Sequence, residues 1–154
     1  MGAYFLDSSA VVKRYVRETG SDFVDELAAS DNDNTIFLAD ITRVEVAAAI
    51  ARRLKGGSVA KQDARDALIA FDYDLASRYV PLEISPILLT DAMSLATKHA
   101  LRGYDAVQLA AALKVNSDLL LDRLPTLTLV SADSELNDAA TAEGLTVENP
   151  NDNE

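Results

Sequence analysis

Residues 4–13, Tyr-Phe-Leu-Asp-Ser-Ser-Ala-Val-Val-Lys, read as a short buried strand that leads directly into a helix. The apolar residues 4–6 form the strand. Asp7 and the two serines after it supply the side-chain acceptors that begin a helix over residues 10–16. A strand that passes so directly into a helix is typical of an α/β fold. This stretch therefore predicts an α/β protein in which Asp7 lies at the end of a strand.

The rest of the chain continues the alternation of short strands and helices. Further strands are expected at residues 36–38, 80–84, 127–130 and 145–147, and further helices at residues 22–29, 42–54, 60–79, 86–100, 105–115 and 134–143. Pro81 places its strand at an edge of the sheet or near a strand end, because proline lacks the amide proton. The pattern predicts one α/β domain over residues 2–148, with a short, mostly parallel sheet flanked by helices. We expect residues 149–154 to be a frayed polar tail.

Composition places the chain among single-domain globular proteins. Its 154 residues are 49% hydrophobic and 25% charged, which is average globular usage. The absence of cysteine and the single histidine, His99, exclude disulfide scaffolds, thiolate zinc sites, cysteine nucleophiles and sites with two imidazoles. We expect no secretory signal and no membrane partner, because no apolar run approaches the roughly 20 residues that span a bilayer. The expectation is a soluble cytoplasmic protein.

Acidic residues outnumber basic ones, and the two kinds are unevenly distributed. The 14 Lys and Arg against 25 Asp and Glu give a net charge of −11, which repels a polyanion. Residues 133–154 contain no basic side chain, whereas residues 43–65 contain six. A nucleic acid would therefore approach the middle of the chain. The basic residues that could grip its phosphates, or could simply form solvated helix faces, are Arg14, Arg17, Arg52, Arg53 and Lys55.

Four carboxylates stand out because each interrupts or follows an apolar stretch. They are Asp7, the only charge in residues 1–12; Glu45, the only charge in 44–51; Asp105, the only charge in 103–113; and Asp133, shortly after the strand expected at 127–130. Each also has a purely structural explanation. The three aspartates could cap or stabilise the first turns of helices. Glu45 could pair with Arg43 or Arg14, since burying an unpaired carboxylate is costly.

Taken together, the four positions predict a metal site. Asp7 and Asp133 both follow strands, so they lie at the same edge of a parallel sheet, where ligand sites gather. If Glu45 and Asp105 converge there, the four like charges raise one another's pKa, and a bound cation would offset their repulsion. Oxygen ligands without cysteine or a second histidine suit Mg²⁺ or Mn²⁺. Ser9 could donate a hydrogen bond to a ligand carboxylate.

The sequence around these carboxylates resembles the PIN domain, and within it the VapC-type toxins of toxin–antitoxin pairs. The stretches that carry the resemblance are Tyr-Phe-Leu-Asp7-Ser-Ser-Ala-Val-Val-Lys, Arg-Val-Glu45-Val, Leu-Arg-Gly-Tyr-Asp105-Ala-Val-Gln-Leu-Ala and Val-Ser-Ala-Asp133. It extends over nearly the whole chain. It implies a PIN-like fold and a Mg²⁺- or Mn²⁺-dependent endoribonuclease, homodimeric and held inactive by a cognate VapB-type antitoxin.

The resemblance also implies roles for the acidic residues. Asp7 and Asp105 become the firmest metal ligands, and Glu45 and Asp133 complete a catalytic quartet, directly or through water. Should Asp133 not reach the site, the substitutes to consider are Asp122 and Asp138. RNA would then be cut by metal-activated water.

Other functions that place aspartates at strand ends fit less well. A phospho-acceptor domain needs an acidic pair near its first strand, and an Asp-x-Asp phosphatase needs a second aspartate where Ser9 stands. The alternative that stays open is a PIN-like RNA- or protein-binding module without nuclease activity.

Overall fold

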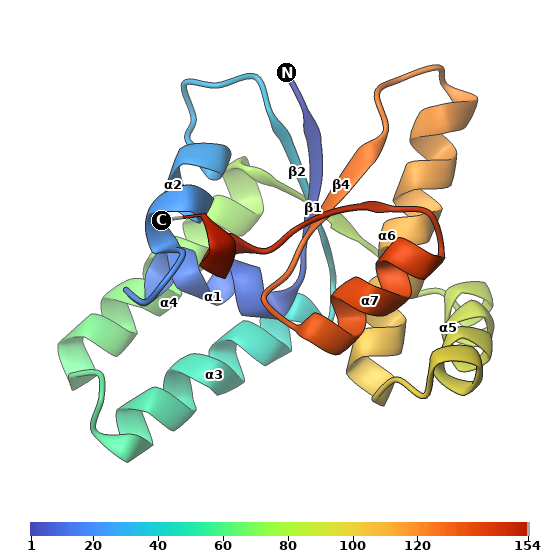
Figure 1. The fold of residues 1–154 in the computed structure, drawn as a ribbon. Helices are drawn as coiled ribbons and strands as arrows, with labels where there is room; N and C mark the ends of the chain where they lie inside the picture. The colour runs from blue at the N-terminus through green and yellow to red at the C-terminus, as the bar shows by residue number, and fades with distance from the viewer. Residues whose placement is uncertain (154) are drawn as a thin grey trace.

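The computed structural model describes residues 1–153 and places a five-stranded parallel sheet between two layers of helices (Figure 1). The strands are β1 (Ala3–Leu6), β2 (Thr35–Ala39), β3 (Tyr79–Leu82), β4 (Leu127–Val130) and β5 (Thr146–Glu148). Their order across the sheet is β3-β2-β1-β4-β5. The predicted single α/β domain with a mostly parallel sheet is confirmed, and Pro81 lies in an edge strand as expected.

Helices connect the strands. They are α1 (Ser8–Tyr15), α2 (Ser21–Ala28), α3 (Thr42–Gly56), α4 (Lys61–Ser77), α5 (Pro86–His99), α6 (Gly103–Leu121) and α7 (Ser134–Ala142), followed after β5 by the short 3-10 helix η1 (Pro150–Asp152). Asp7 and Asp133 each accept a hydrogen bond from a backbone amide of the helix that follows, so both are N-caps. Within residues 1–153, no helix combines the length and apolarity that crossing a membrane requires.

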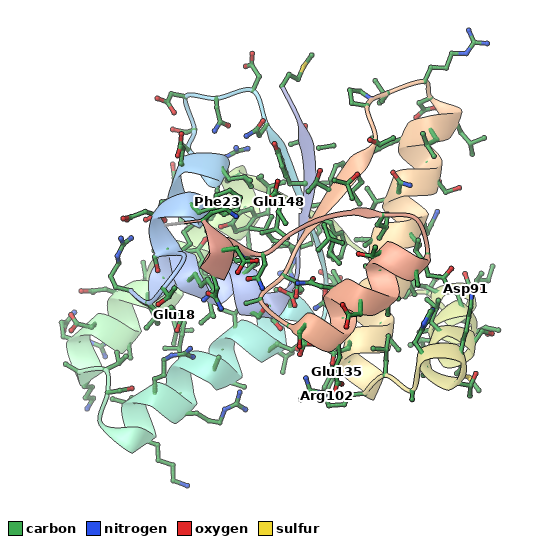
Figure 2. The ribbon with its side chains drawn as sticks, viewed as in Figure 1. Glu18, Phe23, Asp91, Arg102, Glu135 and Glu148 are labelled. Carbon is green, nitrogen blue, oxygen red and sulfur yellow. The ribbon has the colours of Figure 1, made fainter. Side chains whose placement is uncertain are left out.

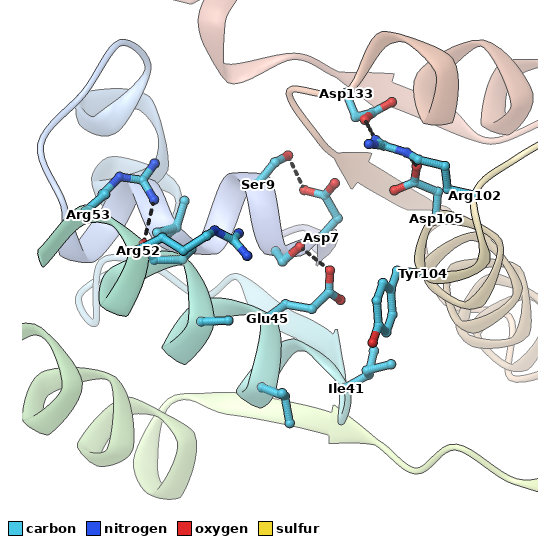
Figure 3. A pocket seen from close by; sticks show the side chains of 15 residues that line it. Asp7, Ser9, Ile41, Glu45, Arg52, Arg53, Arg102, Tyr104, Asp105 and Asp133 are labelled. Carbon is cyan, nitrogen blue, oxygen red and sulfur yellow. Dashed lines mark hydrogen bonds and ion pairs between the residues drawn. The ribbon is translucent and has the colours of Figure 1, made fainter. Parts of the chain in front are cut away.

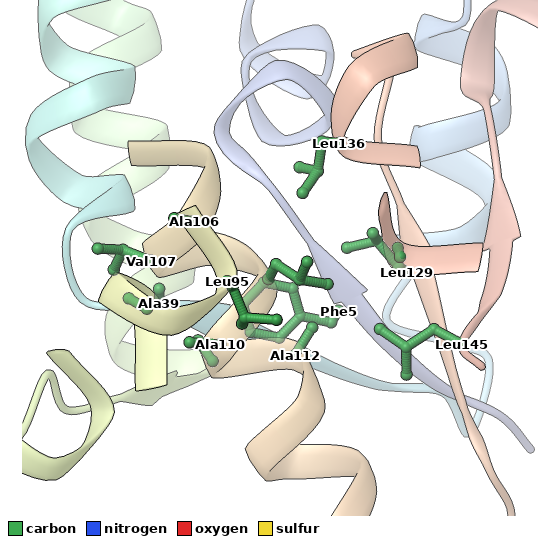
Figure 4. Packing of buried hydrophobic residues seen from close by; sticks show 14 of the residues in the cluster. Phe5, Ala39, Leu95, Ala106, Val107, Ala110, Ala112, Leu129, Leu136 and Leu145 are labelled. Atoms are coloured by element: carbon green, nitrogen blue, oxygen red, sulfur yellow. The ribbon is translucent and has the colours of Figure 1, made fainter. Parts of the chain in front are cut away.

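Both faces of the sheet are buried, because successive strand residues alternate between two cores. In β1, Phe5 packs into the core beneath α5, α6 and α7, whereas Leu6 packs into the core beneath α1 to α4. In β4, Leu129 and Val130 divide in the same way. Figure 2 shows side chains filling the space on both sides of the sheet, and Figure 4 shows Phe5 beside Leu95 of α5. The short apolar runs of the sequence are therefore strands covered on two sides.

Helix α6 is longer than the sequence predicts, since it ends at Leu121 and not near residue 115. The polar residues 116–118 read as the start of a connection. Ser117 and Asp118 lie instead on the outer side of the helix, where Lys114 pairs with Asp118 at 3.1 Å, and the partly buried Asn116 accepts from the Leu127 amide at 2.9 Å. Leu119, one turn further on, packs against the core. A continuous buried face keeps the helix intact across the polar stretch.

The expected fraying of the polar tail is wrong for residues 149–153. Pro150 is buried beside the start of α2, within η1. The close approach requires a glycine at residue 20, whose φ is +86° and where a Cβ would lie 2.7 Å from the Pro150 carbonyl oxygen. The last residue of the tail, Glu154, lies outside the described residues.

The order of the strands fixes where a site can form. The chain passes from β1 outward to β2 and β3, and then returns to the other side of β1 to form β4. Ligand sites of parallel sheets lie beyond the carboxyl ends of the strands, at the point where the strand order reverses in this way. The register pairs Leu6 with Val130, and the amide of Asp7 donates to the Val130 carbonyl oxygen at 3.2 Å. Asp7 and Ser131 therefore lie side by side at this point.

Candidate active site

All four carboxylates singled out in the sequence line one cavity of about 490 Å³ at the carboxyl edge of the sheet (Figure 3). Asp7 follows β1, and Asp133 begins α7 shortly after β4. Glu45 and Asp105 lie in the first turns of α3 and α6. The structure thus brings together four acidic residues that are far apart in the sequence.

The two substitutes considered for Asp133 lie outside this cavity. Asp122 is the C-cap of α6, at the opposite end of that helix from Asp105, and lines a separate hollow beside β3. Asp138 is exposed on α7. Of the three, Asp133 is the aspartate that reaches the cavity.

Asp7 is buried and is held by uncharged donors. Its Oδ1 accepts from the Ser9 hydroxyl at 2.6 Å and from the Ala10 amide at 3.0 Å, and its Oδ2 accepts from the Ser131 hydroxyl at 2.7 Å. The hydrogen bond expected from Ser9 is thus present. Burial raises the pKa of Asp7 to about 6, although the three donors act in the opposite direction. The ionised carboxylate is therefore under-compensated in the protein alone.

Glu45 is half-buried, and each of its carboxylate oxygens has one uncharged donor. Oε1 accepts from the Gln108 side-chain amide at 2.9 Å, and Oε2 accepts from the Ser8 hydroxyl at 2.9 Å. These bonds tie α3 to α6 and to α1. They leave room on each oxygen for a further ligand, since a carboxylate oxygen has two lone pairs.

The arginine partner considered for Glu45 is wrong. Arg43 pairs with Asp40 at 2.9 Å, and Arg14 pairs with Asp74 at 3.3 Å. Arg43 lies two residues before Glu45 on the same helix, and residues at that spacing face different directions. Arg14, at the end of α1, reaches toward α4.

Asp105 and Asp133 form a second pair within the cavity, bridged by Arg102. The guanidinium donates from Nε to Asp105 Oδ2 at 3.1 Å and from a terminal nitrogen to Asp133 Oδ2 at 2.7 Å. Burial, and then repulsion from Asp133, raise the pKa of Asp105, while Arg102 lowers it. The Arg102 side chain is 72% exposed, and it lies at the surface near Glu135 (Figure 2).

The composition of the cavity fits a hard divalent cation, although the carboxylates are not arranged around one point. Among residues 1–153, no three Asp, Glu or His side chains stand in positions that could share one ion. The guanidinium of Arg102 holds two of the four carboxylates in this arrangement. The donors are nevertheless all oxygens, and the buried charge of Asp7 lacks a counterion, so the residues present suit Mg²⁺ or Mn²⁺.

The five basic residues considered as phosphate contacts separate into paired and free side chains. Three of them bind acidic side chains: Arg14 with Asp74, Arg17 with Asp25, and Arg53 with Glu18. Lys55 is exposed but does not line the cavity. Arg52 lines the cavity, and no acidic partner contacts it within residues 1–153. Its guanidinium is directed toward Asp7 and Glu45 (Figure 3).

Sequence reasoning missed four residues that hold the carboxylates: Ser8, Arg102, Gln108 and Ser131. Gln108 and Ser131 contact acidic residues 63 and 124 positions away, which no local pattern indicates. Arg102 lies three residues before Asp105, a spacing at which helix side chains meet. A signal for Gln108 was present, because it is the only polar residue in the apolar run 106–113.

A parallel sheet with four carboxylates converging at its carboxyl edge defines this chain as a single-domain α/β protein with an acidic site. The PIN domain matches residues 4–142. The chain belongs to the PIN domain family, which confirms the resemblance seen in its motifs.

Individual relatives extend this finding. The ribonuclease VapC45 of Mycobacterium tuberculosis is 32% identical over 148 residues, covering 96% of this chain and 95% of the relative. Among solved structures, VapBC2 from Rickettsia felis, bound to a DNA fragment from its promoter, gives a TM-score of 0.63 at 19% identity, covering 96% of this chain and 98% of that one. The sarcin-ricin loop cleaving toxin VapC20 of Mycobacterium tuberculosis gives 0.63 at 14% identity, with coverages of 93% and 96%. At these identities the two structures show a shared fold.

Proposed function

We propose that the protein is a divalent-metal-dependent endoribonuclease, the toxin of a VapBC-type toxin–antitoxin pair. The observation that carries the proposal is the convergence of Asp7, Glu45, Asp105 and Asp133 in one cavity at the carboxyl edge of the sheet. Its support is the 32% identity with a ribonuclease VapC over nearly the whole chain.

In this proposal the four carboxylates have different roles in holding the cation and its water. Asp7 and Asp105 would anchor Mg²⁺ or Mn²⁺, and Glu45 and Asp133 would hold the attacking water or a second ion. When bound, the cation supplies an acidified water and offsets the charge that builds on the phosphate. Arg102 would have to leave Asp105 and Asp133 for both to serve. The Arg102 side chain is 72% exposed, so it can turn away into solvent.

Water, not a side chain, is the nucleophile in this proposal. The hydroxyls of Ser8 and Ser9 donate to Glu45 and Asp7, so neither is directed at a substrate. The only histidine, His99, bonds Glu143 at 2.8 Å and does not line the cavity. Without a neighbouring base, a serine is too weakly acidic to attack a phosphodiester.

Arg52 would contact the RNA. It borders the carboxylates without being neutralised by one, so it can attract a phosphate next to the scissile bond. The other four basic candidates either have acidic partners or lie away from the cavity. The proposed RNA path therefore runs along α3 into the acidic pocket, which agrees with the basic character of residues 43–65.

Protein partners belong to the same proposal. We infer that a VapB-type antitoxin restrains the chain in the cytoplasm, as the VapBC2 complex suggests, and that the toxin is a homodimer. Large apolar side chains exposed on α3 to α5 provide surfaces for such contacts: Val44, Ile69, Tyr73, Ile87 and Met93.

The test is RNA cleavage by the antitoxin-free protein in Mg²⁺, in Mn²⁺ and in EDTA. The wild type is expected to cut in either metal and not in EDTA. Asp105→Asn should lower the rate about 10³-fold, because several kcal/mol of metal-based stabilisation are lost. Asp138→Asn, an exposed aspartate outside the cavity, is the matched control and should cut normally. Melting curves establish that both variants fold.

Two outcomes would contradict the proposal. If the folded Asp105→Asn variant cuts as fast as the wild type, the carboxylates are not the active site. A folded protein that binds Mn²⁺ but cuts no RNA in the pool would favour the PIN-like binding module.

A further inference from the structure

Gln108 is a buried amide in a helix that otherwise presents apolar side chains to the core. Its side chain is 1% exposed, and its neighbours 106–107 and 109–112 are all buried alanine, valine or leucine. It lies one turn after Asp105 on α6. A leucine at such a position would make the fold more stable, because burying an amide costs free energy unless its polar groups are hydrogen-bonded. The amide therefore has a purpose other than packing.

The contacts of Gln108 point to that purpose. Its Nε2 donates to Glu45 Oε1 and to the Thr42 hydroxyl, each at 2.9 Å. A carboxylate can only accept, so the NH₂ group must face Glu45. This orientation leaves the Gln108 Oε1 buried and without a hydrogen-bond partner within residues 1–153. The NH₂ group of Gln108 thus donates to Glu45, while the carbonyl oxygen of the same amide has no hydrogen bond.

The bond restricts an otherwise flexible side chain. Glu45 has three rotatable side-chain bonds, so without these contacts its carboxylate could take many positions. Gln108 holds Oε1 and Ser8 holds Oε2, so the carboxylate is fixed between α6 and α1 with its remaining lone pairs available to the cavity. A ligand that is already in place loses less entropy when an ion binds.

We propose that Gln108 is a positioning residue, whose amide fixes the Glu45 carboxylate in the acidic cavity and thereby raises the affinity of the cavity for a divalent cation. The inference rests on the proposed metal-dependent function and deepens it. Residues that orient ligands by hydrogen bonds typically change metal affinity by about 10- to 100-fold when they are removed.

The experiment compares Gln108→Met with Thr42→Val. Methionine has nearly the shape of glutamine but cannot donate, so the Mn²⁺ affinity measured by calorimetry should fall about tenfold. Valine at residue 42 removes the other acceptor of the same amide and leaves the Glu45 bond intact, so the affinity should stay unchanged. Melting in EDTA shows that each variant is folded. Should Gln108→Met not fold, Gln108→Asn, which withdraws the amide by one methylene, takes its place.

A double-mutant cycle with Glu45→Gln separates positioning from a general structural contribution. If Gln108 acts through the carboxylate, Gln108→Met should lower Mn²⁺ affinity in the wild type but not in Glu45→Gln. An equal loss in both backgrounds, or wild-type affinity in Gln108→Met, would overturn the inference.

The two proposals fail in distinguishable ways. A wild type that binds Mn²⁺ without cutting RNA would contradict the proposed nuclease, while the cycle would still report on Gln108. A wild type that cuts RNA, with Gln108→Met binding Mn²⁺ equally well, would contradict only the positioning. A wild type that binds no Mn²⁺ would overturn both.

Discussion

The two halves of the acidic cavity are held in different ways. Asp7 and Glu45 accept hydrogen bonds from serine hydroxyls, a backbone amide and Gln108, none of which carries a charge. Asp105 and Asp133 share the guanidinium of Arg102. One half is therefore oriented but has no counterion, and the other is partly neutralised by an exposed side chain that can move away.

The difference matters because orientation and charge compensation are separate requirements of a cation site. Uncharged donors fix the direction of a carboxylate without competing for the cation. An arginine offsets part of the charge of its partners and must be displaced before an ion can take its place. Asp7 and Glu45 are therefore already oriented when a cation binds. At Asp105 and Asp133 the cation must displace the guanidinium of Arg102.

The largest effect that would sharpen this comparison is the pH dependence of stability without metal. The folded-state pKa of Asp7 is about 6, above its ordinary 3.8, so the folded protein holds this proton more tightly than the unfolded chain. The Asp7 contribution to the free energy of unfolding is full below pH 4 and is lost as the pH rises through 6. The loss amounts to about 3 kcal/mol.

Asp7→Asn isolates this contribution, since other carboxylates titrate in both proteins. In EDTA, urea unfolding should show that the free energy of unfolding of the variant, relative to that of the wild type, rises between pH 4 and 6. Above pH 6 the difference between the two should stay constant. A difference that does not depend on pH would mean that Asp7 is not the under-compensated group.

The next effect concerns the exchange at Arg102. Arg102→Gln should tighten Mn²⁺ binding about twofold to fivefold, the range expected for exposed ion pairs, because the guanidinium no longer competes. Arg43→Gln is the matched control, since Arg43 also pairs with an aspartate three residues away but does not line the cavity. Calorimetric titration with Mn²⁺ measures both. Unchanged or weaker binding in Arg102→Gln would show that the two halves do not differ as described.

The smallest effect is expected at the rim of the cavity. Arg52→Gln should raise the KM for RNA about threefold, and should reduce the salt dependence of RNA binding by about 0.7 in log–log slope, the value for one phosphate contact on a single strand. Arg53→Gln is the comparison, because Arg53 lines the same cavity but is bound to Glu18. Equal changes in the two variants would remove the distinction between free and paired arginines.

The carboxylates could be found from the sequence because three of them are lone charges in apolar stretches and Asp133 closely follows an apolar strand. Asp7 and Asp105 stand out for that reason alone, and a parallel sheet is enough to place Asp7 and Asp133 at one edge. The central strands β1, β2 and β4 were recognisable because burial on both faces makes them apolar runs. The N-cap explanation for Asp7 and Asp133 also holds, so the structural and functional readings of these residues are compatible.

The rest depends on contacts that sequence patterns do not encode. Gln108 and Ser131 matter through partners that only the fold brings near, and the pairing of Arg102 with Asp133 crosses 31 residues. The end of α6 was misplaced because Asn116 and Asp118 resemble loop residues, whereas Leu119 carries the packing that continues the helix. Tertiary contacts decide such cases.

The pairing of β1 with β4 also sets the order in which the site appears during synthesis. Domains fold as units while the chain is made from its N-terminus. Asp7 emerges early, but its neighbour Ser131 and the last carboxylate, Asp133, come more than 120 residues later. A ribosome making this protein therefore carries an incomplete site until β4 and the start of α7 have been added.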